Sequence, residues 1–222
     1  MQREVMMTGV GGQGVQLCSK TLALAAVHEG RQAMLCGHYA GAIRGGQTDA
    51  SIVISDGRLR ALPILPAAWA GFVMSPQYWS STGPFIRPGG PVVVNSSLVD
   101  ADFAPEGLDV HRIAASEIAE AQGAPMGASM VLLGAFSVLT GLVGLDALVG
   151  AMRELVPPYR TEHLAATSHH RDVEKDRCWL RHVEHSISRG VPPQTRCSTR
   201  TSKAARCIGS TATRAGAPFV PP

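Results

Sequence analysis

The sequence predicts an α/β domain with a Rossmann-like, doubly wound fold, in which a mostly parallel sheet carries helices on both faces. Short continuous apolar runs recur along residues 1–167, as expected for strands that are covered on both sides. A glycine-rich loop joins the first of these runs directly to a helical pattern. Strand-like and helix-like segments then follow one another as a doubly wound fold requires.

The first elements form a strand, loop, helix, strand unit. Residues 5–10 (VMMTGV) are expected to be a buried strand, and the glycine loop follows at once. Val15–His28 is expected to be a helix, because its apolar residues crowd one broad face and Gly30 follows it. Residues 32–37 are expected to be the next strand. The unit places the glycine loop at the carboxyl end of the first strand.

The remaining elements follow from apolar runs and breakers. Four further runs are expected to be strands: residues 50–55, 71–75, Pro91–Asn95 and 108–113. Residues 126–142 are apolar nearly all round, which predicts a buried helix, and Leu145–Leu155 is amphipathic and stops before two prolines. A last short helix is expected over residues 159–167.

The chain divides into residues 1–167, the Rossmann-like domain, and residues 168–222, a basic tail rich in Ser, Thr, Arg and Pro. The tail carries 10 Lys and Arg against 4 Asp and Glu, whereas the remainder carries 10 against 13. This composition predicts disorder. It is also typical of GC-rich DNA translated in a wrong frame, and both interpretations stay open.

Charge and cysteine usage exclude several classes of protein. The positive charge lies in the tail, so it does not indicate a nucleic-acid site, and the apolar runs are too short for a membrane span. No secretory signal precedes the first strand, which favours the cytoplasm. The 5 cysteines show no C-x-x-C spacing, so neither zinc nor an iron–sulfur cluster is expected in this chain. Cys18 and Cys36 lie in apolar segments and are expected to be buried.

The glycine loop is the first candidate site, and its candidate ligand-binding residues are Gly9, Gly11, Gly12, Gln13 and Gly14. Glycines let a phosphate approach the partly positive N–H groups at a helix start. The alternative interpretation is a glycine turn that only packs the helix on the sheet, with Gly14 making that contact. A nicotinamide enzyme would need an acid after the second strand, and no acid follows there until Asp49. No P-loop lysine is present either.

A second glycine motif spans residues 39–49 (YAGAIRGGQTD), and its candidates are Arg44, Gly45 and Gly46. An arginine beside two glycines could clamp an anion, or it could pair with an acid of a partner chain. No nucleophile lies in a nucleophile–base motif, and no His, Cys or carboxylate group has metal-ligand spacing. We therefore assign no catalytic residue and no metal ligand.

Three segments together resemble the gamma subunit of the 2-oxoacid:ferredoxin oxidoreductases: GVGGQGVQ, YAGAIRGGQTDASIVIS and GAPMGASMVLLGAF. The resemblance runs from about residue 5 to about residue 163. It implies a subunit that supports the CoA-dependent oxidative decarboxylation of a 2-oxoacid, with coenzyme A as a ligand of the glycine loop or Arg44. The chain departs from the family pattern at Ala42, where Glu is usual, and at Ser129, where Asn is usual.

The resemblance also implies cofactors and partners outside this chain. Thiamine diphosphate, Mg and [4Fe–4S] clusters would lie in partner subunits, namely thiamine-binding alpha and beta subunits and a ferredoxin-like subunit, with ferredoxin as electron acceptor. The 2-oxoacid itself stays open. Two alternatives remain from the residues alone: a self-contained NAD(P)- or flavin-linked oxidoreductase, and a regulatory module that binds CoA or a nucleotide.

Overall fold

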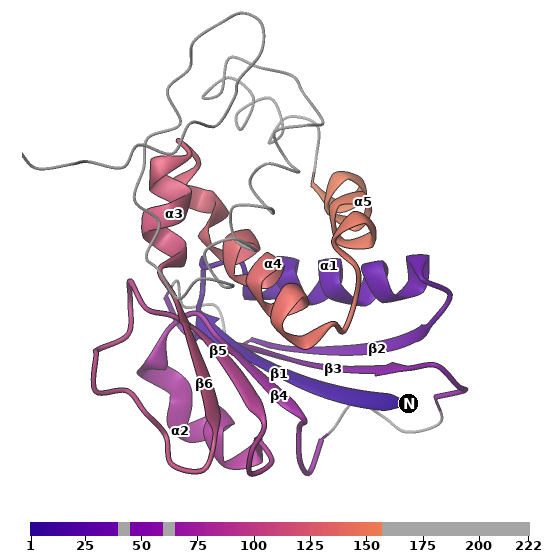
Figure 1. The fold of residues 1–222 in the computed structure, drawn as a ribbon, viewed down its shortest axis with the longest axis horizontal. Helices are drawn as coiled ribbons and strands as arrows, with labels where there is room; N and C mark the ends of the chain where they lie inside the picture. The colour runs from indigo at the N-terminus through magenta and orange to yellow at the C-terminus, as the bar shows by residue number, and fades with distance from the viewer. Residues whose placement is uncertain (40–44, 60–64, 157–222) are drawn as a thin grey trace, which may run out of the picture.

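The computed structural model describes residues 1–39, 45–59 and 65–156 (Figure 1). The helix expected over residues 159–167 and the tail from residue 168 lie outside the described residues. The division of the chain at residue 167 therefore stays a prediction.

The described residues form six strands and five α-helices. The strands are β1 (Gln2–Val10), β2 (Gln32–Tyr39), β3 (Gln47–Ser55), β4 (Ala70–Val73), β5 (Pro91–Asn95) and β6 (Asp109–Ile113). The helices are α1 (Val15–His28), α2 (Trp79–Thr82), α3 (Ala115–Ala121), α4 (Ala128–Thr140) and α5 (Leu145–Leu155). None of these helices is long and apolar enough to cross a membrane.

The six strands form one sheet in the order β2-β3-β1-β4-β5-β6. The pairs β1–β4, β4–β5 and β5–β6 are parallel, whereas β3 is antiparallel to both of its neighbours, β1 and β2. The predicted α/β class with a mostly parallel sheet is confirmed. The strands on either side of α1 run in the same direction, but β3 lies between them.

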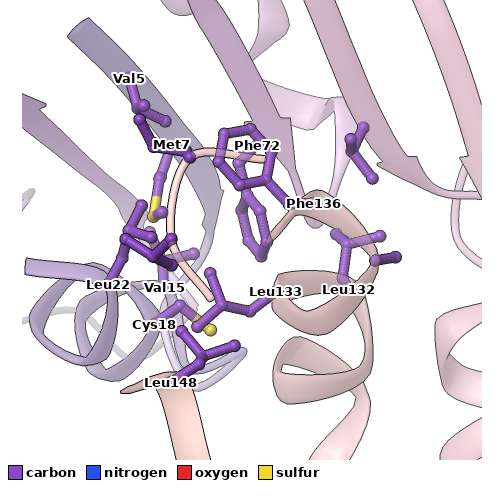
Figure 2. Packing of buried hydrophobic residues seen from close by; sticks show 14 of the residues in the cluster. Val5, Met7, Val15, Cys18, Leu22, Phe72, Leu132, Leu133, Phe136 and Leu148 are labelled. Atoms are coloured by element: carbon purple, nitrogen blue, oxygen red, sulfur yellow. The ribbon is translucent and has the colours of Figure 1, made fainter. Parts of the chain in front are cut away.

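Helices cover both faces of the sheet, as predicted (Figure 1). Helices α1, α4 and α5 lie over one face, where the larger buried cluster includes Leu22, Phe72 and Phe136. Figure 2 shows Phe72 of β4 against Phe136 of α4, with ring centroids 6.3 Å apart and the rings nearly perpendicular. A smaller cluster on the other face packs beneath α2 and includes Val73 and Val94.

Each strand and helix predicted before residue 156 is present in the structure, although the bounds of six of them differ by one to three residues. Helix α1, strand β5 and helix α5 begin and end where predicted. The predicted helix over residues 126–142 is shorter, because Pro125–Gly127 forms a 3-10 turn and Gly141 ends α4 with a φ of 59°. Helix α3 was not predicted, since seven residues give too little periodicity to distinguish a helix from a loop.

Candidate functional site

The first glycine loop, residues 9–14, lies at the carboxyl end of β1, where the chain turns into α1. The connection after β1 leads to the face covered by α1, and the connection after neighbouring β4 leads to α2 on the opposite face (Figure 1). In open α/β sheets, such a switch between neighbouring strands creates the crevice in which ligands bind. The glycine loop therefore borders the position where this fold most often holds a ligand.

Two left-handed residues and one glutamine shape the first glycine loop. Gly12 and Gly14 have φ values of 102° and 83°, which favour glycine strongly. The main-chain N–H of Gln13 donates to the carbonyl of Val10 at 3.0 Å, and Gln13 Oε1 accepts from the N–H of Val10 at 2.8 Å. The side chain of Gln13 thus bonds to the main chain of its own loop, which forms a tight turn.

Two glycines of this loop are required by packing. A methyl group on Gly9 would lie 2.8 Å from Cγ2 of Val15. A methyl group on Gly14 would lie 2.5 Å from Oγ of Ser129, a buried residue of α4. Gly14 was expected to pack the helix on the strand, and this detail is wrong: Gly9 makes that contact, and Gly14 packs α1 against α4.

Gly12 differs from these packing glycines because it faces open space. Among the described residues, no atom beyond its chain neighbours lies within 4 Å of a methyl group placed on Gly12. Within the same part of the chain, no side chain caps the N-terminus of α1, and its first turn holds no acidic residue. The free N–H groups and the positive end of the helix dipole therefore suit an anion.

The structure brings the two glycine motifs together. The N–H of Gly11 donates to the carbonyl of Gly46 at 2.8 Å, and neighbouring Gly45 is exposed with a φ of 82°. The pairing inferred from sequence is thus a contact in space. Arg44, together with the rest of residues 40–44, lies outside the described residues, so its part in the site stays a prediction.

Sequence reasoning missed a polar cluster beneath the two loops, the Asp49 network, which consists of Thr8, Gln16, Gln47, Asp49 and Ser81. Asp49 Oδ1 accepts from the Thr8 hydroxyl at 2.6 Å, and its main-chain carbonyl accepts from Gln16 Nε2 at 2.7 Å. Gln47 Nε2 donates to the Asp49 carboxylate and, at 2.7 Å, to the Ser81 hydroxyl. Its members lie on four elements, so no single stretch of sequence reveals the network.

The two described cysteines lie in different environments. Cys18 is buried, as expected, and its thiol donates to the carbonyl of Ser129 at 3.3 Å. Burial raises the pKa of this thiol from 9.0 to about 12, so it is neutral at physiological pH. Cys36 is only half-buried, contrary to expectation, because it lies on β2, a strand at the edge of the sheet.

The sheet order bears on the alternative of a self-contained dinucleotide enzyme. In such enzymes the second strand lies beside the first, and its terminal acid reaches the ribose. Here β3 separates β1 from β2, so the end of β2 lies one strand further from the glycine loop. This arrangement disfavours the nicotinamide alternative.

Among the residues that the structure describes, no group of three His, Cys, Asp or Glu side chains is placed to hold a metal ion. The expectation that this chain binds no metal stays a prediction.

Fold and loops together define a Rossmann-like domain with two joined glycine loops in front of an uncapped helix N-terminus. The chain belongs to the pyruvate ferredoxin/flavodoxin oxidoreductase family, whose model matches residues 4–166. The family resemblance inferred from the three sequence segments is confirmed.

Individual relatives agree with this assignment. The 2-oxoglutarate synthase subunit KorC of Methanocaldococcus jannaschii is 29% identical over 180 residues, which is 79% of this chain and 96% of KorC. A keto/oxoacid ferredoxin oxidoreductase gamma subunit from Geobacter sulfurreducens has a similar fold, with a TM-score of 0.68 and 24% identity, over 85% of this chain and 97% of its own.

A second solved structure has the same fold within a longer chain. It is the 2-oxoglutarate:ferredoxin oxidoreductase of Magnetococcus marinus with 2-oxoglutarate, coenzyme A and succinyl-CoA bound. The match has a TM-score of 0.64 at 18% identity and covers 81% of this chain but 31% of the other. This fold therefore occurs both as a separate subunit and as part of a larger chain.

Proposed function

We propose that this chain is the gamma subunit of a multi-subunit 2-oxoacid:ferredoxin oxidoreductase, in which it supports assembly and binds coenzyme A without performing redox chemistry. The observation that carries the proposal is the joined pair of glycine loops at the N-terminus of α1, linked by the hydrogen bond from Gly11 to Gly46. Membership of the oxidoreductase family supplies the reaction class.

The local geometry supports a phosphate of CoA as the ligand. Phosphate oxygens accept hydrogen bonds from main-chain N–H groups and are favoured at the positive end of a helix. The open side of Gly12 leaves room for such a group, and no side chain in the described part of the chain competes for the α1 N-terminus. Gly45 and Gly46 border the same space, and we propose that Arg44 beside them adds a positive charge.

The proposal assigns the remaining cofactors to partner chains. Bound CoA would supply the thiol that accepts the acyl group, while thiamine diphosphate, Mg and [4Fe–4S] clusters would lie in the alpha, beta and ferredoxin-like subunits. Thiolate or imidazole groups would be needed to hold a cluster. The division rests on the family resemblance, and among the described residues no group of three His, Cys, Asp or Glu side chains is placed to hold a metal ion.

Partners and compartment follow from the same proposal. The chain would assemble with thiamine-binding alpha and beta subunits and a ferredoxin-like iron–sulfur subunit, and ferredoxin would accept the electrons. The proposal places the complex in the cytoplasm, where free thiols such as those of Cys18 and Cys36 stay reduced.

Affinity purification of the native complex tests the proposal. The chain should co-purify with thiamine-binding and iron–sulfur chains, the complex should contain iron, and its oxidation of a 2-oxoacid should require CoA. Purification of the chain alone, with CoA bound and no such partners, would favour the regulatory-module alternative. Stoichiometric NADH binding by the isolated chain would favour the self-contained oxidoreductase.

A further inference from the structure

Asp49 occupies a position from which it contacts the residues that flank both glycine loops. In the antiparallel register of β1 and β3, Asp49 lies directly opposite Thr8, the residue before the first loop. Gln16 lies in the first turn of α1, just after the first loop, and Gln47 is the residue after Gly46 in the second glycine motif. All three side chains donate hydrogen bonds to Asp49, to its carboxylate or to its main-chain carbonyl.

These hydrogen bonds fix the relative position of three elements. Thr8 belongs to β1, Gln16 to α1 and Gln47 to β3, and both glycine loops are attached to these elements. Gln47 extends the Asp49 network to Ser81 of α2, on the other face of the sheet. Since the loops meet through the Gly11–Gly46 hydrogen bond, any change in the relative position of β1 and β3 at this edge alters that contact.

The strength of the network comes from charge and burial. Hydrogen bonds to an ionised acceptor are about twice as strong as those between neutral groups. Thr8 is fully buried, so removal of the Asp49 carboxylate would take away the acceptor of a hydroxyl that water does not reach. The carboxylate therefore contributes more to local geometry than an exposed polar contact does.

We propose that Asp49 is the positioning residue of the ligand site, because it holds the two glycine loops in the contact made by the Gly11–Gly46 hydrogen bond, beside the space proposed for a phosphate. The ligand in this inference rests on the proposed function, whereas the effect on the loops does not. Asp49 acts through the main chain of Gly11 and Gly46 and needs no contact with the ligand.

Asp49→Ala in the full chain tests this inference by hydrogen exchange and by CoA titration. We expect the Gly11 amide to exchange about tenfold faster and the Kd for CoA to rise about tenfold, because one charge-assisted hydrogen bond contributes free energy of that order. Asp49→Asn keeps one carbonyl oxygen for the Thr8 hydroxyl and should give smaller changes in both quantities.

Two further variants separate positioning from general destabilisation. Asp109→Ala removes an exposed strand carboxylate that pairs with His111 on β6, and it should leave both the Gly11 amide and the Kd unchanged. Gln47→Ala removes the half-buried side chain that donates to the Asp49 carboxylate and to Ser81, and it keeps Asp49 itself. This variant therefore tests the network if Asp49→Ala fails to fold. In the assembled oxidoreductase, both network variants should raise KM for CoA with kcat retained.

The outcomes distinguish the inference from the proposed function. Wild-type exchange at Gly11 in Asp49→Ala and Gln47→Ala would overturn the inference, and so would faster exchange with an unchanged Kd. A wild-type protein, alone and in its complex, that does not bind CoA would overturn the proposed function. In that case, hydrogen exchange at the Gly11 amide would still decide whether Asp49 holds the two loops together.

Discussion

The first glycine loop uses glycine for two different reasons, at an inner wall formed by Gly9 and Gly14 and at a rim formed by Gly12. On the inner wall, Gly9 and Gly14 lie so close to Val15 and Ser129 that no methyl group fits without displacement. On the rim, Gly12 has a positive φ but faces open space. A glycine-rich motif therefore combines positions that serve the fold with positions that leave room for a ligand.

Substitutions at these two kinds of position should therefore report on different properties, folding in the first case and ligand binding in the second. Inner-wall changes should lower stability regardless of any ligand, because they force neighbouring side chains to move. A substitution at Gly12 should lower stability only through backbone strain, and its main effect should be on ligand affinity.

Gly14→Ala should have the largest effect, a loss of about 3 kcal/mol, because backbone strain at positive φ adds to overpacking. Urea denaturation of the full chain measures it. Gly107→Ala is the matched control, since Gly107 has a φ of 73° and no atom near a placed methyl group. Adding Ser129→Ala should restore part of the loss, and a double variant no more stable than Gly14→Ala would contradict the packing explanation.

Gly9→Ala should cost about 2 kcal/mol, because its methyl group would meet Gln13, Val15 and Met74 without added backbone strain. Thermal or urea unfolding gives the value. Gly57→Ala is the control, since Gly57 also has no positive φ but lies in open space. Equal stabilities of the two variants would show that β1 and α1 are less closely packed than the structure indicates.

The pH dependence of stability tests whether water reaches the buried thiol of Cys18, which contacts Ser129 behind the inner wall. Burial raises the pKa of the thiol from 9.0 to about 12, so the folded state keeps a proton that the unfolded state loses above pH 9. The thiol's stabilising contribution is complete below the unfolded pKa and decreases as pH rises, by about 1.4 kcal/mol at about pH 10.

The measurement for Cys18 compares wild-type protein with Cys18→Ala at about pH 8 and about pH 10. Relative to Cys18→Ala, the wild-type protein should lose about 1.4 kcal/mol of unfolding free energy between these two pH values, since the variant lacks the titrating group. A difference that stays constant with pH would mean that water reaches the thiol in the folded protein.

Gly12→Ala should have the smallest effect on stability, a loss of about 1 kcal/mol from strain alone. Gly89→Ala should lose a similar amount, because Gly89 has a φ of 73° and equally open surroundings. Urea denaturation of both variants checks the match. A much larger loss for Gly12→Ala would place Gly12 with the inner wall instead of the rim.

Local signals were sufficient to predict much of the fold. Gly30 and the prolines around residues 91 and 157 mark element ends, and α1, β5 and α5 were predicted at their observed boundaries. The position of β3 between β1 and β2 was not predictable in this way. Strand order depends on contacts between distant segments, and an apolar run carries no information about the direction of its neighbour.

The candidate site shows the same division. The two glycine motifs were predicted to act together, and the Gly11–Gly46 hydrogen bond joins them. The distinction between Gly14 and Gly12 required the position of Ser129, more than a hundred residues away. Asp49 was noted only as the last residue of the second glycine motif and as an acid too late in the chain for a ribose, because its partners on β1 and α1 are set by tertiary structure.

Titration of CoA into the assembled complex, carrying wild-type chain, Gly12→Ala or Gly89→Ala, determines whether the first glycine loop binds a phosphate of CoA. The two variants are matched in backbone strain and differ in whether they border the α1 N-terminus. Gly12→Ala should raise the Kd for CoA about tenfold or more, and Gly89→Ala should leave it unchanged. Wild-type affinity in the Gly12→Ala complex would contradict the assignment of this loop to the phosphate of CoA.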